Sequence, residues 1–149
     1  MTDFEWVGPA MTQTVPWVKA AGITFGEASG TRVVAHLPDA PEGHNHVGGP
    51  HAAMIFGLGE TTSGAVGLAA FGATMERATP LVVRSEIEYV KLAKGPLTAT
   101  ATLERPAADV LAELDAGTRP EFTVGVSITD AEGRETSRMT VVWTLRPNR

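Results

Sequence analysis

Apolar and polar residues alternate one by one through much of the second half of the chain. Residues 97–103, 122–129 and 137–145 show this period of two, and residues 81–92 form a longer run rich in strand-forming types. Successive side chains of a strand point to opposite faces, so the pattern indicates antiparallel strands with one covered face. Residues 130–133 predict the hairpin turn between the last two strands.

The first fifty residues predict smaller elements. Residues 9–21 favour a short helix interrupted near Pro16, because proline removes a backbone donor. Residues 23–27 and 31–37 predict two strands joined by a Ser-Gly turn. Residues 39–50, rich in Pro, Gly, Asn and His, predict a loop.

One long helix is predicted from His51 to about Gly72. Its many glycines and alanines are poor helix formers at a surface, but they let strands approach the helix axis closely. Residues 52–73 also have roughly the length of a membrane span. We reject that interpretation because the segment contains Glu60 and five glycines, without flanking basic clusters.

Together these elements predict an α+β fold in one domain, residues 1–149. Five to six antiparallel strands curl around the long helix. Residues 1–22 form an N-terminal helical segment. Residues 106–117, with proline at the start and glycine at the end, predict a short helical insertion.

Composition and charge narrow the class of protein. Hydrophobic residues make up 43% and charged residues 19%, which is typical of a globular chain. The net charge of −5 argues against a nucleic-acid partner. The chain has no cysteine, which excludes disulfides and thiolate metal sites and fits a cytoplasmic location. Residues 1–6 carry acids rather than a basic apolar leader, so we expect no secretory signal.

Candidate chemistry is concentrated between residues 44 and 60. A turn rich in histidine and glycine, residues 44–51, leads directly into the long helix, where Glu60 is the single charged residue of an apolar run. The start of a helix offers unpaired N–H groups and a favourable dipole for an anionic oxygen. A carboxylate among apolar neighbours is partly desolvated, which makes it more basic.

This segment resembles a known family. The pattern Asn45-x-x-Gly48-x-x-His51, followed nine positions later by Glu60, is similar to that of hotdog-fold acyl-CoA thioesterases of the phenylacetate (PaaI) type. Residues 87–95 also resemble the third strand and turn of that family, and the likeness spans roughly residues 23–146. It implies a hotdog fold and hydrolysis of an acyl-CoA to a carboxylic acid and CoA, without metal or redox cofactor.

The chain departs from the family at one point. The family has His-Gly-Gly where this chain has His51-Ala52-Ala53, so two methyl groups crowd the approach to the helix start. The backbone N–H groups survive that change. A non-hydrolytic acyl-CoA or fatty-acyl binding protein on the same fold therefore remains the alternative to a hydrolase.

Thioester hydrolysis assigns roles to the residues of the helix. The backbone N–H groups of Ala52 and Ala53 are candidates for the oxyanion hole, and Glu60 for the general base or nucleophile. Ala53 and Glu60 are seven residues apart, about 10 Å along a helix, so one chain's Glu60 does not reach its own helix start. We therefore predict a site shared across a two-fold dimer, or within a dimer of dimers.

Supporting residues carry weaker predictions. Asn45 orients the loop or a water molecule, and His51 either caps the helix or contacts substrate. The remaining candidates for substrate binding are Gly48 and Gly49 in the loop, Thr61, Ser63 and Gly64 beside Glu60, Lys91 and Lys94 for the CoA phosphates by resemblance, and Arg84 and Arg138 as alternatives.

Two other classes of site are disfavoured. His44-x-His46, with His51 and Glu60, suggests a metal centre of the cupin kind, but the segment that follows is helical rather than a strand. A hotdog dehydratase resembles enzymes with an Asp/His pair about five residues apart near the helix start, and no aspartate precedes His51 at that spacing. We expect no metal, no nucleic acid and no membrane partner.

Overall fold

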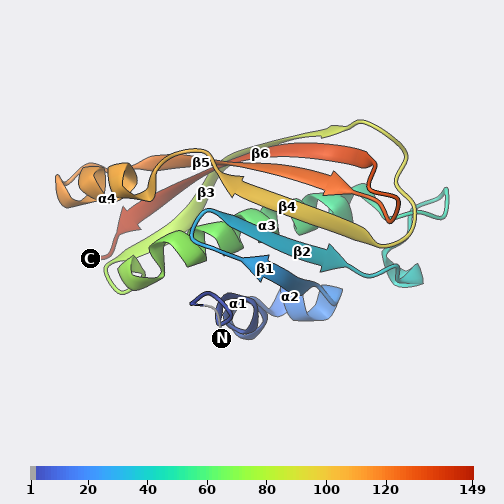
Figure 1. Ribbon diagram of the computed structural model, residues 1–149, viewed down its shortest axis with the longest axis horizontal. Helices are drawn as coiled ribbons and strands as arrows, with labels where there is room; N and C mark the ends of the chain where they lie inside the picture. Colours follow the sequence, from blue (N-terminus) through green and yellow to red (C-terminus); the bar gives the residue numbers. More distant parts are fainter. Residues whose placement is uncertain (1–2) are drawn as a thin grey trace.

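The computed structural model describes residues 3–149 as one curved antiparallel sheet with a long helix packed on its inner face (Figure 1). The sheet order is β1-β2-β4-β5-β6-β3. The strands are β1 (Thr24–Ala28), β2 (Arg32–Leu37), β3 (Ala78–Tyr89), β4 (Leu97–Leu103), β5 (Glu121–Thr129) and β6 (Glu135–Pro147). The helices are α1 (Val7–Thr14), α2 (Pro16–Ala21), α3 (Ala52–Phe71) and α4 (Ala107–Asp115), with 3-10 turns η1 (Pro41–Gly43) and η2 (Gly72–Thr74).

Small residues bring α3 close to the sheet, as the sequence predicts. A Cβ atom added to Gly59 would lie 2.6 Å from the Met139 sulfur, and one on Gly67 would lie 3.5 Å from the Phe122 ring. Only glycine fits the first of these positions without a shift of the neighbouring side chain. The predicted α+β class and the predicted hotdog fold, a central helix wrapped by a curved sheet, are therefore confirmed.

The segment Ala52–Thr74 passes a length and hydropathy test for a membrane span, with a mean hydropathy of 1.2. However, 61% of its most apolar 18-residue stretch is buried inside the protein. The core helix of a globular fold meets the same test, and the packing on the sheet accounts for the apolar sequence of α3.

The predicted helical segments are present with shorter bounds. The N-terminal segment forms α1 and α2, which break at Val15, and Pro16 begins the second helix, where its missing N–H costs nothing. Met1 and Thr2 lie outside the described residues. The predicted insertion at residues 106–117 contains α4, whose Val110 side chain is buried.

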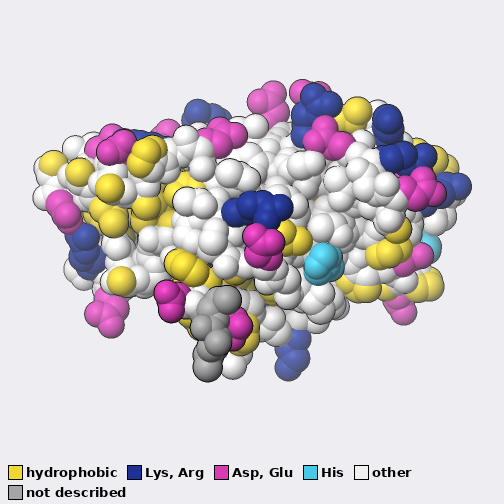
Figure 2. Space-filling model, viewed as in Figure 1, with side chains coloured by type: hydrophobic (Ala, Val, Ile, Leu, Met, Phe, Trp, Pro, Cys, Tyr) yellow, Lys and Arg dark blue, Asp and Glu magenta, His cyan; other side chains and the backbone are white. Residues whose placement is uncertain are grey.

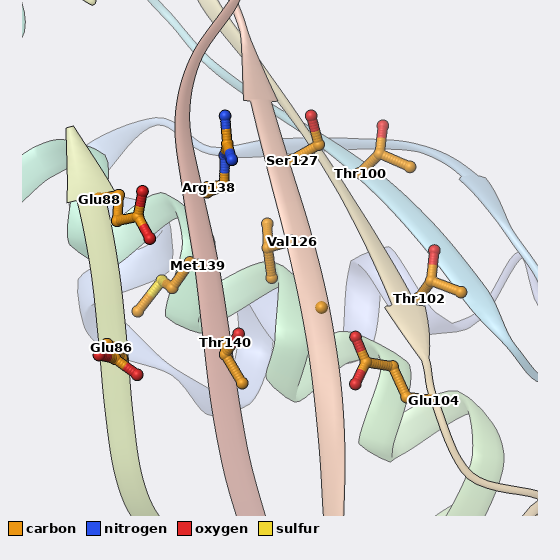
Figure 3. A pocket seen from close by; sticks show the side chains of 11 residues that line it. Glu86, Glu88, Thr100, Thr102, Glu104, Val126, Ser127, Arg138, Met139 and Thr140 are labelled. Atoms are coloured by element: carbon orange, nitrogen blue, oxygen red, sulfur yellow. The ribbon is translucent and has the colours of Figure 1, made fainter. Parts of the chain in front are cut away.

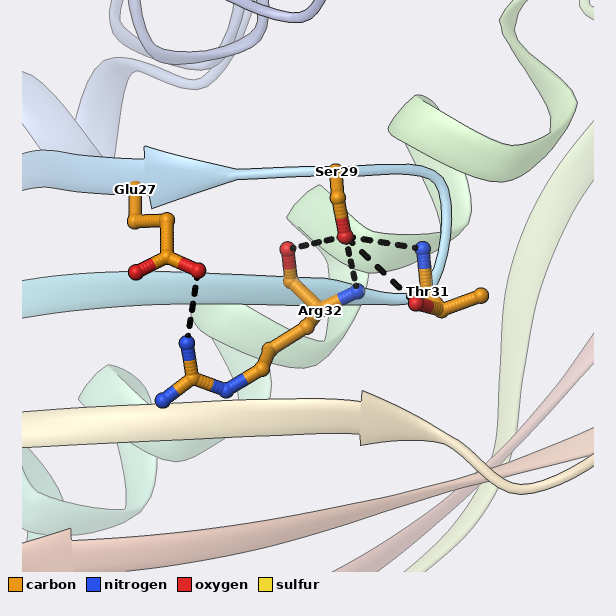
Figure 4. Close-up of polar contacts among 4 residues, drawn as sticks. All are labelled: Glu27, Ser29, Thr31 and Arg32. Carbon is orange, nitrogen blue, oxygen red and sulfur yellow. Dashed lines mark hydrogen bonds and ion pairs between the residues drawn. The ribbon is translucent and has the colours of Figure 1, made fainter.

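Turn chemistry fixes the hairpins. Between β1 and β2, the Ser29 hydroxyl accepts hydrogen bonds from the backbone N–H groups of Thr31 and Arg32 (Figure 4). Arg32 also pairs with Glu27 across the two strands, with 2.9 Å between the charged atoms. The predicted turn at residues 130–133 is confirmed, and Gly133 supplies its positive φ of 80°.

β3 differs from the prediction in its bounds and in its burial. It begins three residues earlier than expected, at Ala78, and ends at Tyr89 rather than Leu92. It is an edge strand that pairs only with β6, and most of its residues are exposed or half-buried instead of covered on one face. Large apolar side chains of this edge are exposed at Val82, Val83, Tyr89, Val90 and Leu92.

Candidate functional site

The start of α3 has one free donor and one capped donor. The Ala52 N–H makes no hydrogen bond within residues 3–149. The Ala53 N–H donates to Nδ1 of His51 at 2.9 Å, so His51 is the N-cap of the helix. Of the two roles predicted for His51, the structure shows the capping one. The imidazole of His51 therefore occupies the Ala53 N–H, which is one of the two predicted oxyanion-hole donors.

The loop before α3 is held by Asn45. Its side-chain oxygen accepts hydrogen bonds from the N–H groups of Val47 and Gly49 at 3.0 and 3.2 Å, and its amide donates to the Pro50 carbonyl. Gly48 has a φ of +76°, and Gly49 packs directly under the Ala93 carbonyl, where a Cβ atom would collide. Asn45 and the two glycines therefore shape the approach to the helix start.

Glu60 carries a half-buried carboxylate without an internal partner. Its side chain makes no hydrogen bond or ion pair within the described part of the chain, and burial raises its pKa above the ordinary value. Its backbone is fixed instead: the Ser63 hydroxyl donates to the Glu60 carbonyl at 2.6 Å and accepts from the Trp143 indole at 2.9 Å. The position of Glu60 is thus well defined while its carboxylate stays available.

Glu60 and the helix start lie on the same side of α3. Ala53 is exposed, and Phe56, Gly57, Glu60 and Gly64 are half-buried at helical spacing. We call these five residues the α3 strip. Because α3 is one continuous helix, Ala53 and Glu60 lie about 10 Å apart along its axis. Within one chain, Glu60 does not complete a site with its own helix start.

A shallow depression of about 310 Å³ adjoins the helix start and contains a residue that sequence reasoning missed. The Tyr89 hydroxyl donates to the Ala52 carbonyl at 3.2 Å and ties the end of β3 to the first turn of α3. Tyr89 lies opposite Ser137, two positions from the Ile87–Met139 pair on the inner face. Strand alternation therefore indicates the face on which Tyr89 lies, but not its contact with α3. The lining is Asn45, Pro50, Ala52, Ile55, Tyr89, Lys91, Leu92 and Ala93.

The predicted binding residues separate into two groups. Lys91 and Lys94 are exposed beside the helix start, Lys91 in the depression and Lys94 next to Gly49. Gly64 lies on the α3 strip. In contrast, Thr61 and Ser63 are 3% and 0% exposed, so within one chain their side chains face the interior.

Arg84 and Arg138 lie on the opposite, outer face of the sheet. In the register of β3 and β6, Arg138 lies opposite Glu88, and Arg84 lies opposite Val142. Arg138 and Val142 alternate with the inward-facing residues of β6. Figure 3 shows Arg138 beside Ser127 in an open hollow of about 430 Å³. The structure does not bring either arginine to the helix start. The hollow also contains Glu86, Glu88 and Glu104, so it is unsuited to the phosphates of CoA.

The histidines of the loop have other contacts. His44 Nε2 lies 2.6 Å from a carboxylate oxygen of Asp39, and His51 caps α3. Within residues 3–149, no group of three or more His, Asp or Glu side chains is arranged to hold a metal ion. The expectation that the chain uses no metal remains a prediction.

Figure 2 shows acidic and basic side chains interspersed on the face it views.

Comparison with solved structures shows the same fold in other proteins, two of which are named as thioesterases below. A probable thioesterase of unknown function from Pseudomonas aeruginosa superimposes with a TM-score of 0.84 and 21% identity, over 99% of this chain and 97% of that one. A putative thioesterase from Shewanella oneidensis gives 0.81 and 12%, over 97% of both chains. The Escherichia coli PaaI protein of the phenylacetic acid degradation operon gives 0.74 and 15%, over 95% and 93%.

At these identities the likeness establishes the fold, and the names belong to the other proteins. No curated protein sequence matches the chain. One family does match, over residues 5–145: the domain of unknown function DUF4442. That match spans nearly the whole sequence: it includes the long helix, strands β1 to β5, most of β6, and both Glu60 and the start of α3. The chain therefore belongs to the DUF4442 family, and it has the hotdog fold.

Proposed function

We propose that this protein is an acyl-CoA thioesterase, which hydrolyses an acyl-CoA to a carboxylic acid and CoA. The observation that supports it most is Glu60, a half-buried carboxylate with no partner among residues 3–149, on the α3 strip that begins at Ala53, next to the free N–H of Ala52. The names of two structurally similar hotdog proteins, a probable and a putative thioesterase, support the same reaction class. The lack of cysteine supports a cytoplasmic setting.

In the proposed reaction, the thioester carbonyl oxygen accepts hydrogen bonds at the start of α3. The Ala52 N–H is available in the free protein, and the Ala53 N–H becomes available when the His51 ring turns away. Glu60 acts as general base toward water or as nucleophile. In the first case water attacks the carbonyl carbon, Glu60 takes its proton, the C–S bond breaks and the thiolate of CoA receives a proton.

The site needs a second copy of the chain. A Glu60 about 10 Å from its own helix start serves the helix start of a partner when a two-fold axis relates the two α3 strips. The unpaired edge of β3 supports the same assembly, because a long apolar strand edge is stable in water only when it is covered or paired. We propose a homodimer, alone or as half of a tetramer, with two shared sites.

Lys91 and Lys94 are proposed to attract the phosphates of CoA. Both are exposed at the end of β3 beside the helix start, so they flank the side of the site from which the CoA portion would enter. No metal or redox cofactor takes part in the proposed reaction.

The first experiment measures hydrolysis of a panel of acyl-CoAs by the wild type and by Glu60→Ala and Glu60→Gln. Loss of a general base lowers kcat by roughly 100- to 10,000-fold. The matched control is Glu88→Gln, which lies on the outer face and should leave the rate unchanged. Equal rates for the wild type and Glu60→Ala would remove the proposal.

A second experiment tests the shared site. Ala52→Pro removes the free N–H at the first helical position, where proline is tolerated, and the ψ of 144° at His51 already suits a residue before proline. Co-expressed Ala52→Pro and Glu60→Ala chains form mixed dimers with one intact site. Random pairing then restores about a quarter of the wild-type rate, although each variant alone is inactive. No recovery, or a fully active monomer, would contradict the shared site.

A second candidate function is a non-hydrolytic acyl-CoA or fatty-acyl binding protein. The His51 cap on the Ala53 N–H and the methyl groups of Ala52 and Ala53 favour it, because they crowd the oxyanion position. The two candidates differ in turnover. A wild type that binds acyl-CoAs without hydrolysing any of the panel supports the binding protein.

A further inference from the structure

An indole ring fills the space that a glycine leaves on the α3 strip. Trp17 of α2 packs on Gly57 so closely that a Cβ atom there would lie 2.8 Å from Cζ2 and 3.0 Å from Cζ3 of the ring. Yet Trp17 remains 41% exposed. The ring therefore covers this part of α3 on one side and faces open space on the other.

This contact lies next to the candidate carboxylate. Gly57 and Glu60 are three residues apart, so they are neighbours on the same helix face, separated by about 4.5 Å along the axis. Phe56 adds a second half-buried aromatic ring to the strip. The surroundings of Glu60 toward Gly57 are thus apolar, and the lysines lie beyond Gly57, beside the start of α3.

A second tryptophan provides a comparison within the same helix. Trp6 packs on Gly72 in a similar way, with its Cη2 atom 2.8 Å from the position of an added Cβ. Its indole N–H donates to the Asp3 carbonyl at 3.0 Å. The Trp17 indole N–H has no such partner within the described residues. Trp6 is therefore anchored by a hydrogen bond, whereas no hydrogen bond of the Trp17 ring is found among residues 3–149.

We propose that Trp17 is the end wall of the acyl pocket and restricts the protein to short or compact acyl groups. This inference rests on the proposed site at Glu60. In the shared site, the CoA portion lies beside the lysines and helix start of one chain. The acyl group then extends along the apolar side of the other chain's Glu60, toward the Gly57 and Trp17 of that chain. The indole occupies the space that the distal carbons of a longer chain would need.

The experiment compares straight-chain acyl-CoAs from two to twelve carbons with the wild type, Trp17→Ala and Trp17→Phe. We expect kcat/KM of the wild type to fall with chain length. Trp17→Ala should raise the value for the longest chains by about tenfold or more and leave acetyl-CoA within about threefold, since each newly buried methylene adds a favourable contribution. Trp17→Phe should lie between them. Trp6→Ala is the matched control and should keep the wild-type profile.

The same ratio of long-chain to short-chain values in the wild type and Trp17→Ala would overturn the inference, as would a wild type that prefers long chains. If no variant hydrolyses any acyl-CoA, the proposed hydrolase function fails by itself. The chain-length series is then measured as Kd for the same acyl-CoAs, and a shift toward long chains in Trp17→Ala but not Trp6→Ala still supports Trp17 as the wall. Circular dichroism of each variant confirms folding.

Discussion

The two halves of α3 have the same kind of sequence but different surroundings. From Thr61 to Phe71 the helix is almost entirely buried, and its glycine at position 67 packs against Phe122. From Ala52 to Glu60 only Ile55, Leu58 and Gly59 are buried, while the α3 strip faces outward. The second half anchors the helix in the sheet. The first half presents polar groups that the fold itself does not use.

The largest expected effect concerns the anchored half. Phe71 is 1% exposed and packs on Phe122 with ring centroids 4.8 Å apart. Phe71→Ala should lower the free energy of unfolding by about 3–5 kcal/mol, because it leaves a cavity in the core. Urea denaturation measures the change. Phe56→Ala, on the half-buried strip, is the control and should cost less; equal losses would break the distinction between the halves.

A smaller effect is expected at the helix start. His51→Ala removes the cap on the Ala53 N–H and should lower stability by about 1 kcal/mol, the usual value of an N-cap. His46→Ala is the control, since His46 is exposed and makes no hydrogen bond within residues 3–149. The uncapped N–H is then open to substrate oxygen, so KM for acyl-CoA should not rise. A strong rise in KM would instead show that His51 contacts substrate.

The smallest expected change in stability is at Glu60, where the substitution should stabilise the protein rather than destabilise it. Burial raises its folded-state pKa above the ordinary 4.5, so its ionisation disfavours the folded state. This destabilisation is absent below the pKa that Glu60 has in the unfolded chain. It grows as the pH rises through the pKa of Glu60 in the folded state. Glu60→Gln should therefore be more stable than wild type at about pH 7 and equal to it at about pH 3. Thermal unfolding at both pH values measures this, and a less stable variant at pH 7 would show that Glu60 has a structural partner.

The sequence predicted the architecture well because its periodicities are strong. β4 has the bounds expected from alternation, Leu97–Leu103, and the glycines of α3 predicted its close contact with strands. The start of β3 was less well predicted, because a proline such as Pro80 usually interrupts a strand. An edge strand tolerates proline, since every second N–H of an edge points away from the sheet. The exposure of β3 also follows from its edge position, which alternation does not reveal.

The site was only partly predictable. The spacing of Asn45, His51 and Glu60 selected the segment that holds the candidate site, and the helix geometry placed Ala53 and Glu60 apart. The contacts of Tyr89 and Trp17 were not visible, because they join residues 37 and 40 positions apart through the packing of other elements. Arg84 shares the outer face with Glu86 and Glu88 by plain alternation, but a bulge between Val82 and Arg84 breaks this alternation with the first part of β3. A single bulge reverses the side to which the next residue points.

The hydrogen bonds from Trp143 to Ser63 and from Ser63 to the Glu60 carbonyl hold the main chain but leave the carboxylate alone. The fold therefore uses the main-chain carbonyl of Glu60, whereas the proposed chemistry uses its carboxylate. Under that proposal, a lineage that exchanges this acid for a neutral side chain keeps its architecture and loses only its chemistry. Descendants of an enzyme on this scaffold can thus persist as inert homologues, which separates common ancestry from shared catalysis.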